Sequence, residues 1–91
     1  MKLVYKIDST NDREGNLKSI PTSWSEPEYF IYVAHVGRSA ILIDNDDENM
    51  TIRTSTIEDI TIWENGIKLT TRNTVYYLKP VIKGEWWYEI F

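Results

Sequence analysis

Apolar and polar residues alternate most regularly between residues 60 and 78, in the stretch ITIWENGIKLTTRNTVYYL. Asn65-Gly66 predicts a two-residue hairpin turn there, because a type I′ turn needs positive φ at both central residues. Arg72-Asn73 predicts a second two-residue turn, and the two turns together predict a three-stranded antiparallel meander. Six apolar side chains then share one face of the meander: Ile60, Ile62, Ile67, Leu69, Tyr76 and Leu78.

The opposite face of the meander brings together Trp63, Lys68 and Tyr77. The predicted register pairs Lys68 with Trp63 on one side and with Tyr77 on the other, so that the lysine stem lies between two aromatic rings. Such a face can hold a local cation–π contact or stack exposed nucleic-acid bases. We expect residues 27–36 to cover it.

A second hairpin is predicted from residues 40–44 and 50–54, which are apolar and flank an acidic loop. A four-residue loop joins the two strands in this prediction. The pairs that share the predicted core face are Ile43 with Met50 and Ile41 with Ile52.

The phase of the apolar positions changes between Ile52 and Ile57, which predicts a bulge or bend near residues 54–56. This bend would carry the chain from the second hairpin into the meander. Alternation also predicts a first strand near residues 2–8 and a last strand from residue 84 or 85 to residue 91.

Residues 27–36 carry signals of both a helix and a strand. Ser25 and Glu28 match a capping box, and Gly37 suits the position after a helix end. The segment YFIYV, in contrast, consists of residues that prefer strands. We expect a short helix, with a strand as the alternative. The helical stripe would consist of Tyr29, Tyr32, Val33 and Val36.

These elements predict one mainly β domain over residues 1–91, in which an antiparallel meander closes into a small, strongly bent barrel. The expected architecture resembles the SH3-like or OB-like class, in architecture only. An antiparallel sheet with one packed helix, an α+β fold, is the alternative. Aromatic residues make up 13% of the chain, which also favours strands.

The net charge of −4 arises entirely in the first half of the chain. Residues 1–48 contain nine Asp or Glu and five Lys or Arg, whereas residues 49–91 contain five of each. An acidic chain is poorly suited to nucleic-acid phosphates and to anionic membrane surfaces. The start MKLVYKID does not resemble a signal peptide, and no apolar run reaches the ~20 residues that span a bilayer. We therefore expect a soluble, cytoplasmic protein.

No group of residues predicts catalysis, a metal site or a cofactor. His35 is the one histidine and cysteine is absent, so a catalytic triad or a zinc–thiolate site has no ligands or nucleophile. The acidic loop lacks the Gly and the Glu of a calcium loop, with Asn49 and Ser55 in those positions. A small-molecule site would require a pocket around His35, Arg38 or Arg53.

Two surfaces are the main candidates for contact with a partner. The acidic tip between residues 40–44 and 50–54 consists of Asp44, Asp46, Asp47 and Glu48. The C-terminal edge consists of Trp87, Glu89 and Phe91, which share one face of the last predicted strand. Exposed aromatic residues on a terminal strand favour strand addition or pairing between two copies of the chain.

We expect a non-enzymatic protein-interaction module, such as a small acidic inhibitor or adaptor. A phage or mobile-element protein of this kind would block a basic, nucleic-acid-binding host protein in the host cytoplasm. A homodimer through the C-terminal strand is a further expectation. The alternatives are a barrel that binds single-stranded nucleic acid through Trp63 and Tyr77, and a small-molecule-binding domain.

Overall fold

Residues 3–81, which the computed structural model describes, fold mainly into β-strands. Strands form because β-branched and aromatic residues recur along the whole segment. The elements are, in chain order, β1 (Tyr5–Asn11), α1 (Thr22–Ser25), β2 (Tyr29–Val33), β3 (Ser39–Asp44), β4 (Thr51–Trp63), β5 (Gly66–Thr71) and β6 (Val75–Pro80).

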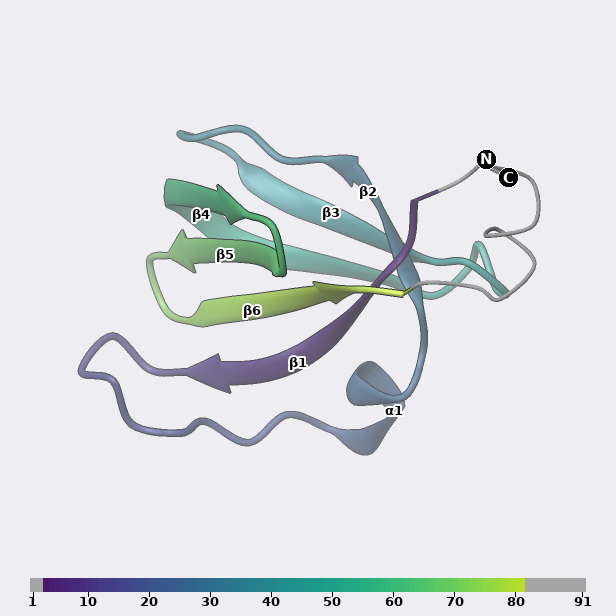
Figure 1. The fold of residues 1–91 in the computed structure, drawn as a ribbon, viewed down its shortest axis with the longest axis horizontal. Helices are drawn as coiled ribbons and strands as arrows, with labels where there is room; N and C mark the ends of the chain where they lie inside the picture. The colour runs from purple at the N-terminus through teal and green to yellow at the C-terminus, as the bar shows by residue number, and fades with distance from the viewer. Residues whose placement is uncertain (1–2, 82–91) are drawn as a thin grey trace.

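The strands form one antiparallel sheet that closes on itself in the order β1-β2-β3-β4-β5-β6 (Figure 1). β1 pairs with β6 along its length, from Tyr5 opposite Pro80 to Asn11 opposite Val75. Its pairing with β2, within the described residues, is the single pair of Tyr5 and Tyr29. The prediction of a mainly β, antiparallel and barrel-like fold is confirmed.

The prediction of a helix over residues 27–36 is wrong, because this segment contains strand β2. A helical stripe would bury Tyr29, Tyr32 and Val36 together. Tyr29 is 1% exposed, but Tyr32 and Val36 are 68% and 60% exposed. The strand forms because its aromatic and β-branched residues pair with β3 along their length. Residues 27–36 therefore do not form the predicted helical cover over Trp63, Lys68 and Tyr77.

Ser25 and Gly37, two of the residues that suggest a helix over residues 27–36, take part in other local structures. Ser25 ends α1, where its hydroxyl donates a hydrogen bond to the carbonyl oxygen of Thr22 at 3.2 Å. Gly37 has a φ of 92° in the turn between β2 and β3, where the N–H of Arg38 donates to the carbonyl oxygen of His35. Glycine tolerates positive φ in a hairpin turn as well as at a helix end, so this signal fits both structures.

The meander of β4, β5 and β6 is confirmed, with one change of register. β5 and β6 pair as predicted, with Leu69 opposite Tyr76. β4 and β5 pair two residues away from the predicted register, with Trp63 opposite Gly66 and residues 64–65 in the turn. A shift of two residues keeps every side chain on its predicted face.

Gly66 is needed for its small size rather than for a positive φ. The residues with positive φ in the described part of the chain are Gly15 and Gly37, so Asn65-Gly66 does not form a type I′ turn. A Cβ atom on Gly66 would clash with the backbone carbonyl oxygen of Leu78 on β6. Glycine here allows β5 and β6 to approach each other closely.

The hairpin of β3 and β4 has the predicted strands in a different register. Leu42, not Ile41, lies opposite Ile52. The loop is one residue longer than predicted, and a slip of one residue exchanges the two faces of a strand. As a result Ala40 and Leu42 are fully buried, whereas Ile41 and Ile43 are only half-buried.

The predicted bulge near residues 54–56 is confirmed by a register shift between β3 and β4. At the bulge the Thr54 hydroxyl takes the place of a backbone carbonyl of the neighbouring strand. It accepts a hydrogen bond from the N–H of Ala40 at 2.9 Å. A second register shift follows between β4 and β5. β4 therefore bends strongly and takes part in both hairpins (Figure 1).

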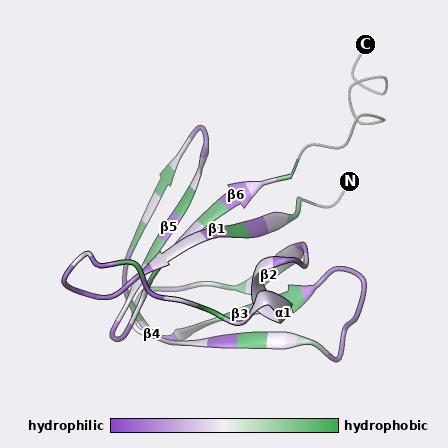
Figure 2. Cartoon of the chain, turned by 90° about the horizontal axis from the view of Figure 1, so that it is seen from below, coloured by the Kyte–Doolittle hydropathy of each residue, from purple (hydrophilic) through white to green (hydrophobic). Residues whose placement is uncertain are grey.

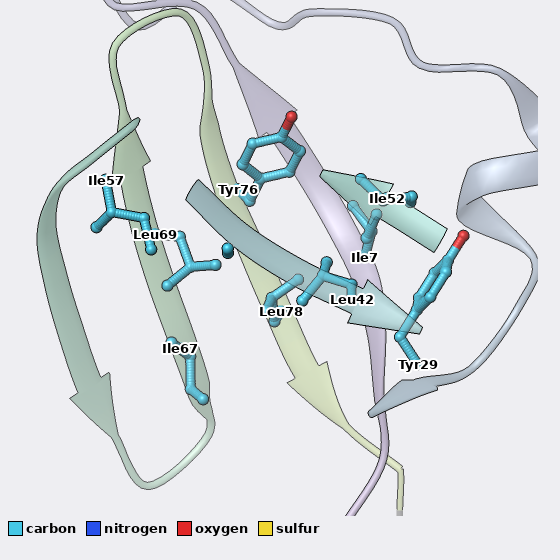
Figure 3. Packing of buried hydrophobic residues seen from close by; sticks show 10 residues of the cluster. Ile7, Tyr29, Leu42, Ile52, Ile57, Ile67, Leu69, Tyr76 and Leu78 are labelled. Carbon is cyan, nitrogen blue, oxygen red and sulfur yellow. The ribbon is translucent and has the colours of Figure 1, made fainter. Parts of the chain in front are cut away.

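The interior of the ring holds one cluster of buried apolar side chains (Figure 3): Ile7, Tyr29, Ala40, Leu42, Ile52, Ile57, Ile67, Leu69, Tyr76 and Leu78. Four predicted core residues of the meander belong to it, and Ile60 packs against it. The prediction is wrong for Ile62, which is 72% exposed. Ile62 lies beside the β4–β5 turn at the rim of the ring, beyond the cluster.

Candidate functional site

Among residues 3–81, each half of β4 has a neighbouring strand on one side only. β3 pairs with the first half as far as Thr56, and β5 pairs with the second half from Ile57 to Trp63. Along Asp59–Trp63, the edge away from β5 meets no other strand of the described chain. Unpaired strand edges bind extended segments of other chains through main-chain hydrogen bonds.

Large apolar side chains lie exposed beside this free edge. Ile62 is 72% exposed, Trp63 is 42% exposed and Leu3 is 60% exposed. All three line one groove of about 200 Å³ between the β4–β5 turn and the start of β1. The other described residues that line the groove are Tyr5, Glu64, Gly66, Ile67 and Pro80.

Acidic residues flank the same edge. Glu58 forms an ion pair with Arg13, the one ion pair within residues 3–81. Asp59 accepts a hydrogen bond from the Thr61 hydroxyl at 3.2 Å, and Glu64 lies at the groove. Neither Asp59 nor Glu64 forms an ion pair within residues 3–81.

The predicted aromatic face is only partly assembled. Lys68 lies opposite Tyr77, with its Nζ atom 5.9 Å from the centre of the ring. Trp63 is displaced by the two-residue shift of register, because Thr61 takes its place opposite Lys68. The lysine lies over the tyrosine face that a stacking base would need. Within residues 3–81, no helix covers this side of the meander.

The acidic loop between β3 and β4 is held by its own hydrogen bonds. Asp44 is 8% exposed, and its Oδ1 atom accepts a hydrogen bond from the N–H of Asp46 at 2.8 Å. Asp47 accepts one from the N–H of Asn49 at 3.0 Å. Burial and, to a smaller extent, the Asp44 carboxylate raise the pKa of Tyr29 to about 12. Asp44 therefore holds the loop in place.

The remaining predicted residues of the acidic tip, Asp46, Asp47 and Glu48, are exposed to solvent. The loop is strongly hydrophilic and lies at one end of the β3–β4 hairpin (Figure 2). Among residues 3–81, no three His, Cys, Asp or Glu side chains are grouped closely enough to hold a metal ion. The loop presents negative charge without a metal-binding geometry.

The predicted C-terminal edge of Trp87, Glu89 and Phe91 lies outside the described residues. The described chain reaches Val81, directly after Pro80, which lines the groove beside Ile62.

Sequence reasoning named His35, Arg38 and Arg53 as markers of a pocket. His35 is exposed in the turn between β2 and β3 and does not line either of the recesses that Arg53 lines. Arg53 lines two recesses, and Arg38 lines one of them. Lys18, Trp24 and Tyr76 also line a recess with Arg53, although Tyr76 and Arg53 are far in the sequence from the segment of Lys18 and Trp24.

Comparison with protein-family models, with curated proteins and with solved structures finds no match to this chain. Residues 3–81 contain no helix that is long and apolar enough to cross a membrane.

Proposed function

We propose that this protein is a non-enzymatic interaction module that binds an extended segment of a basic partner protein at the free edge of β4. The observation that carries the proposal is a strand edge that no segment of residues 3–81 pairs with, and the exposed apolar residues beside it, Ile62 at 72% and Trp63 at 42% exposure. Exposed large apolar side chains next to an open edge are typical of interaction sites.

The groove beside the edge supplies an anchor for the partner. An incoming strand hydrogen-bonds to the main chain of Asp59–Trp63, and one of its apolar side chains enters the groove between Leu3 and Ile62. Burial of the Ile62 or Trp63 side chain would contribute roughly 1.5–3 kcal/mol each. Tryptophan in such a position is frequently the residue that dominates binding.

Charge determines the chemistry of the partner. Asp59 and Glu64 flank the site, and the chain has a net charge of −4. Lysine or arginine in the bound segment would pair with these carboxylates, and the exposed Asp46, Asp47 and Glu48 would speed the encounter by long-range attraction. This charge suits an inhibitor of a basic, nucleic-acid-binding protein, encoded by a phage or mobile element and acting in the host cytoplasm.

The test is a comparison of partner capture by the wild-type chain, by one double variant and by one matched control variant. Ile62→Ser with Trp63→Ser removes the apolar anchor, and Leu17→Ser removes an 85% exposed leucine on another part of the surface. Proteins from a lysate of the source organism are captured and quantified by mass spectrometry. We expect a basic protein whose capture falls about tenfold in the double variant and is unchanged in Leu17→Ser.

The identified partner is then measured against charge variants by calorimetry. Asp59→Lys with Glu64→Lys should weaken binding and reduce its dependence on salt, because exposed charges act over about 8–10 Å at ordinary ionic strength. Equal loss of capture in Leu17→Ser, or full capture by the Ile62 and Trp63 variant, would contradict the proposed site.

A further inference from the structure

Two recesses adjoin the bend of β4, away from the free edge of its second half. The first, of about 370 Å³, lies between residues 18–24, the bend of β4 and the β5–β6 turn. The second, of about 320 Å³, lies beside the β2–β3 turn. Arg53 lines both recesses and connects them.

Positive charge is concentrated around these recesses. The described residues that line them include Lys18, Arg38 and Arg53 and no carboxylate, although the chain has 14 acidic and 10 basic residues. None of the three cations takes part in an ion pair within residues 3–81. Unneutralised cations that surround a recess attract small anions to it.

The lysine is held in position by its neighbours. Lys18 Nζ donates hydrogen bonds to Thr74 Oγ1 at 2.7 Å and to the carbonyl oxygen of Asn73 at 3.3 Å. An ammonium group has three donors, so one remains for a ligand. The Arg53 guanidinium adds a planar set of N–H donors, which matches the geometry of a carboxylate or a phosphate.

Aromatic side chains form part of the first recess. Trp24 is half-buried in its wall, and Tyr76 is 7% exposed. The hydroxyl group of Tyr76 points away from the apolar cluster (Figure 3). Burial raises the pKa of Tyr76, with a hydrogen bond to Thr74 acting in the opposite direction. The phenol therefore stays neutral at physiological pH and can donate a hydrogen bond.

We propose that these recesses bind a small aromatic molecule that carries a phosphate or carboxylate group. The anionic group contacts Lys18 and Arg53, and the aromatic ring lies against Trp24. Arg38 adds positive charge to the second recess, which it lines together with Arg53. This site does not use the free edge of β4, so it stands independently of the proposed partner binding.

The experiment is a titration of the isotopically labelled full chain, followed by amide and indole NMR signals. The probes are phenyl phosphate and benzoate, inorganic phosphate as the anion alone, and benzyl alcohol as the ring alone. Phenyl phosphate or benzoate should shift the signals of Ser55, Asn73 and Thr74 and the Trp24 indole. Inorganic phosphate should bind about tenfold more weakly, and benzyl alcohol should cause no such shifts.

Substitutions distinguish a specific site from general charge attraction. Arg53→Gln and Lys18→Gln should each weaken phenyl phosphate binding about tenfold. Lys79→Gln, which removes an exposed cation on β6, is the matched control and should bind as the wild type does. Circular dichroism verifies that each variant keeps the wild-type strand content.

Three results would overturn the proposal. The first is the absence of shifts at these amides with any probe at millimolar concentration. The second is equal weakening by Lys79→Gln, which would indicate diffuse attraction. The third is tighter binding of a short oligothymidylate than of phenyl phosphate, which would assign the cations to a nucleic-acid surface instead.

Discussion

Within the described residues 3–81, both halves of β4 have one unpaired edge, but only the first half is covered. In the first half Ile52 is 4% exposed, and the unpaired edge borders a recess that residues 18–24 help to close. In the second half Ile62 is 72% exposed, and residues 58–63 are exposed or at most half-buried. Both isoleucines belong to the alternating apolar pattern of one strand. Alternation determines the face of a side chain, whereas burial depends on a covering segment from elsewhere in the chain.

The largest difference between the two halves should appear in stability. Ile52→Ala should lower the free energy of unfolding by about 2–5 kcal/mol, because it removes buried methyl groups and leaves a cavity. Ile62→Ala should change it by less than about 0.5 kcal/mol, since its side chain is exposed. Urea unfolding followed by circular dichroism measures both, and equal losses would show that the second half is as well packed as the first.

The next effect tests the close approach between β6 and Gly66, which lies opposite Trp63 at the end of the second half of β4. Gly66→Ala should destabilise the fold by about 1–3 kcal/mol, because its Cβ atom meets the backbone of Leu78. Gly15→Ala is an instructive control: its Cβ has no neighbour within 4 Å, so any loss comes from its φ of 92°. Thermal unfolding of both variants separates the two causes. A neutral Gly66→Ala would mean that β5 and β6 can move apart without loss.

A smaller effect is expected at the bend between the halves. Thr54→Val should cost about 1–2 kcal/mol, because the buried N–H of Ala40 loses its acceptor. Thr61→Val removes a hydroxyl from the exposed half, where its bond to Asp59 is open to water, and should be nearly neutral. Chemical unfolding of the pair measures whether the bulge depends on this hydrogen bond.

The smallest effect is expected at alkaline pH, where the stability should depend on the buried Tyr29. The pKa of Tyr29 is raised to about 12, so the folded state favours the neutral phenol. Stability from this group is complete below the ordinary pKa near 10 and falls as the pH rises from about 10 towards 12. Tyr29→Phe should flatten this fall. Unfolding midpoints across this pH range test the difference.

Local turn signals predicted the parts of the fold that depend on neighbouring residues. Arg72-Asn73 correctly predicted the register of β5 and β6, and the change of phase after Ile52 correctly predicted the bulge. The register of β3 and β4 was missed because Asp44 lengthens the loop by bonding to the N–H of Asp46. Apolar residues on both faces of β3 left no pattern that could correct this one-residue slip.

Both candidate sites depend on relations that the sequence pattern does not contain. The free edge of β4 exists because β3 pairs no further than Thr56, which follows from the relative lengths and bends of two strands. The recess combines Lys18, Arg53 and Tyr76 from three segments that meet only after folding. The sequence did indicate a pocket around His35, Arg38 or Arg53, and two of these residues, Arg38 and Arg53, line the recesses.

The pairing of Tyr5 with Tyr29 gives the ring a seam. Loss of this one contact would separate β1 from β2 without disturbing the ladders on their other sides, so the ring would open into a sheet with two new edges. Such local opening requires less free energy than unfolding of the core strands. Amide hydrogen exchange at Tyr5 and Tyr29 should therefore run ahead of exchange in β5, and the molecule should unwrap along this line before it unfolds.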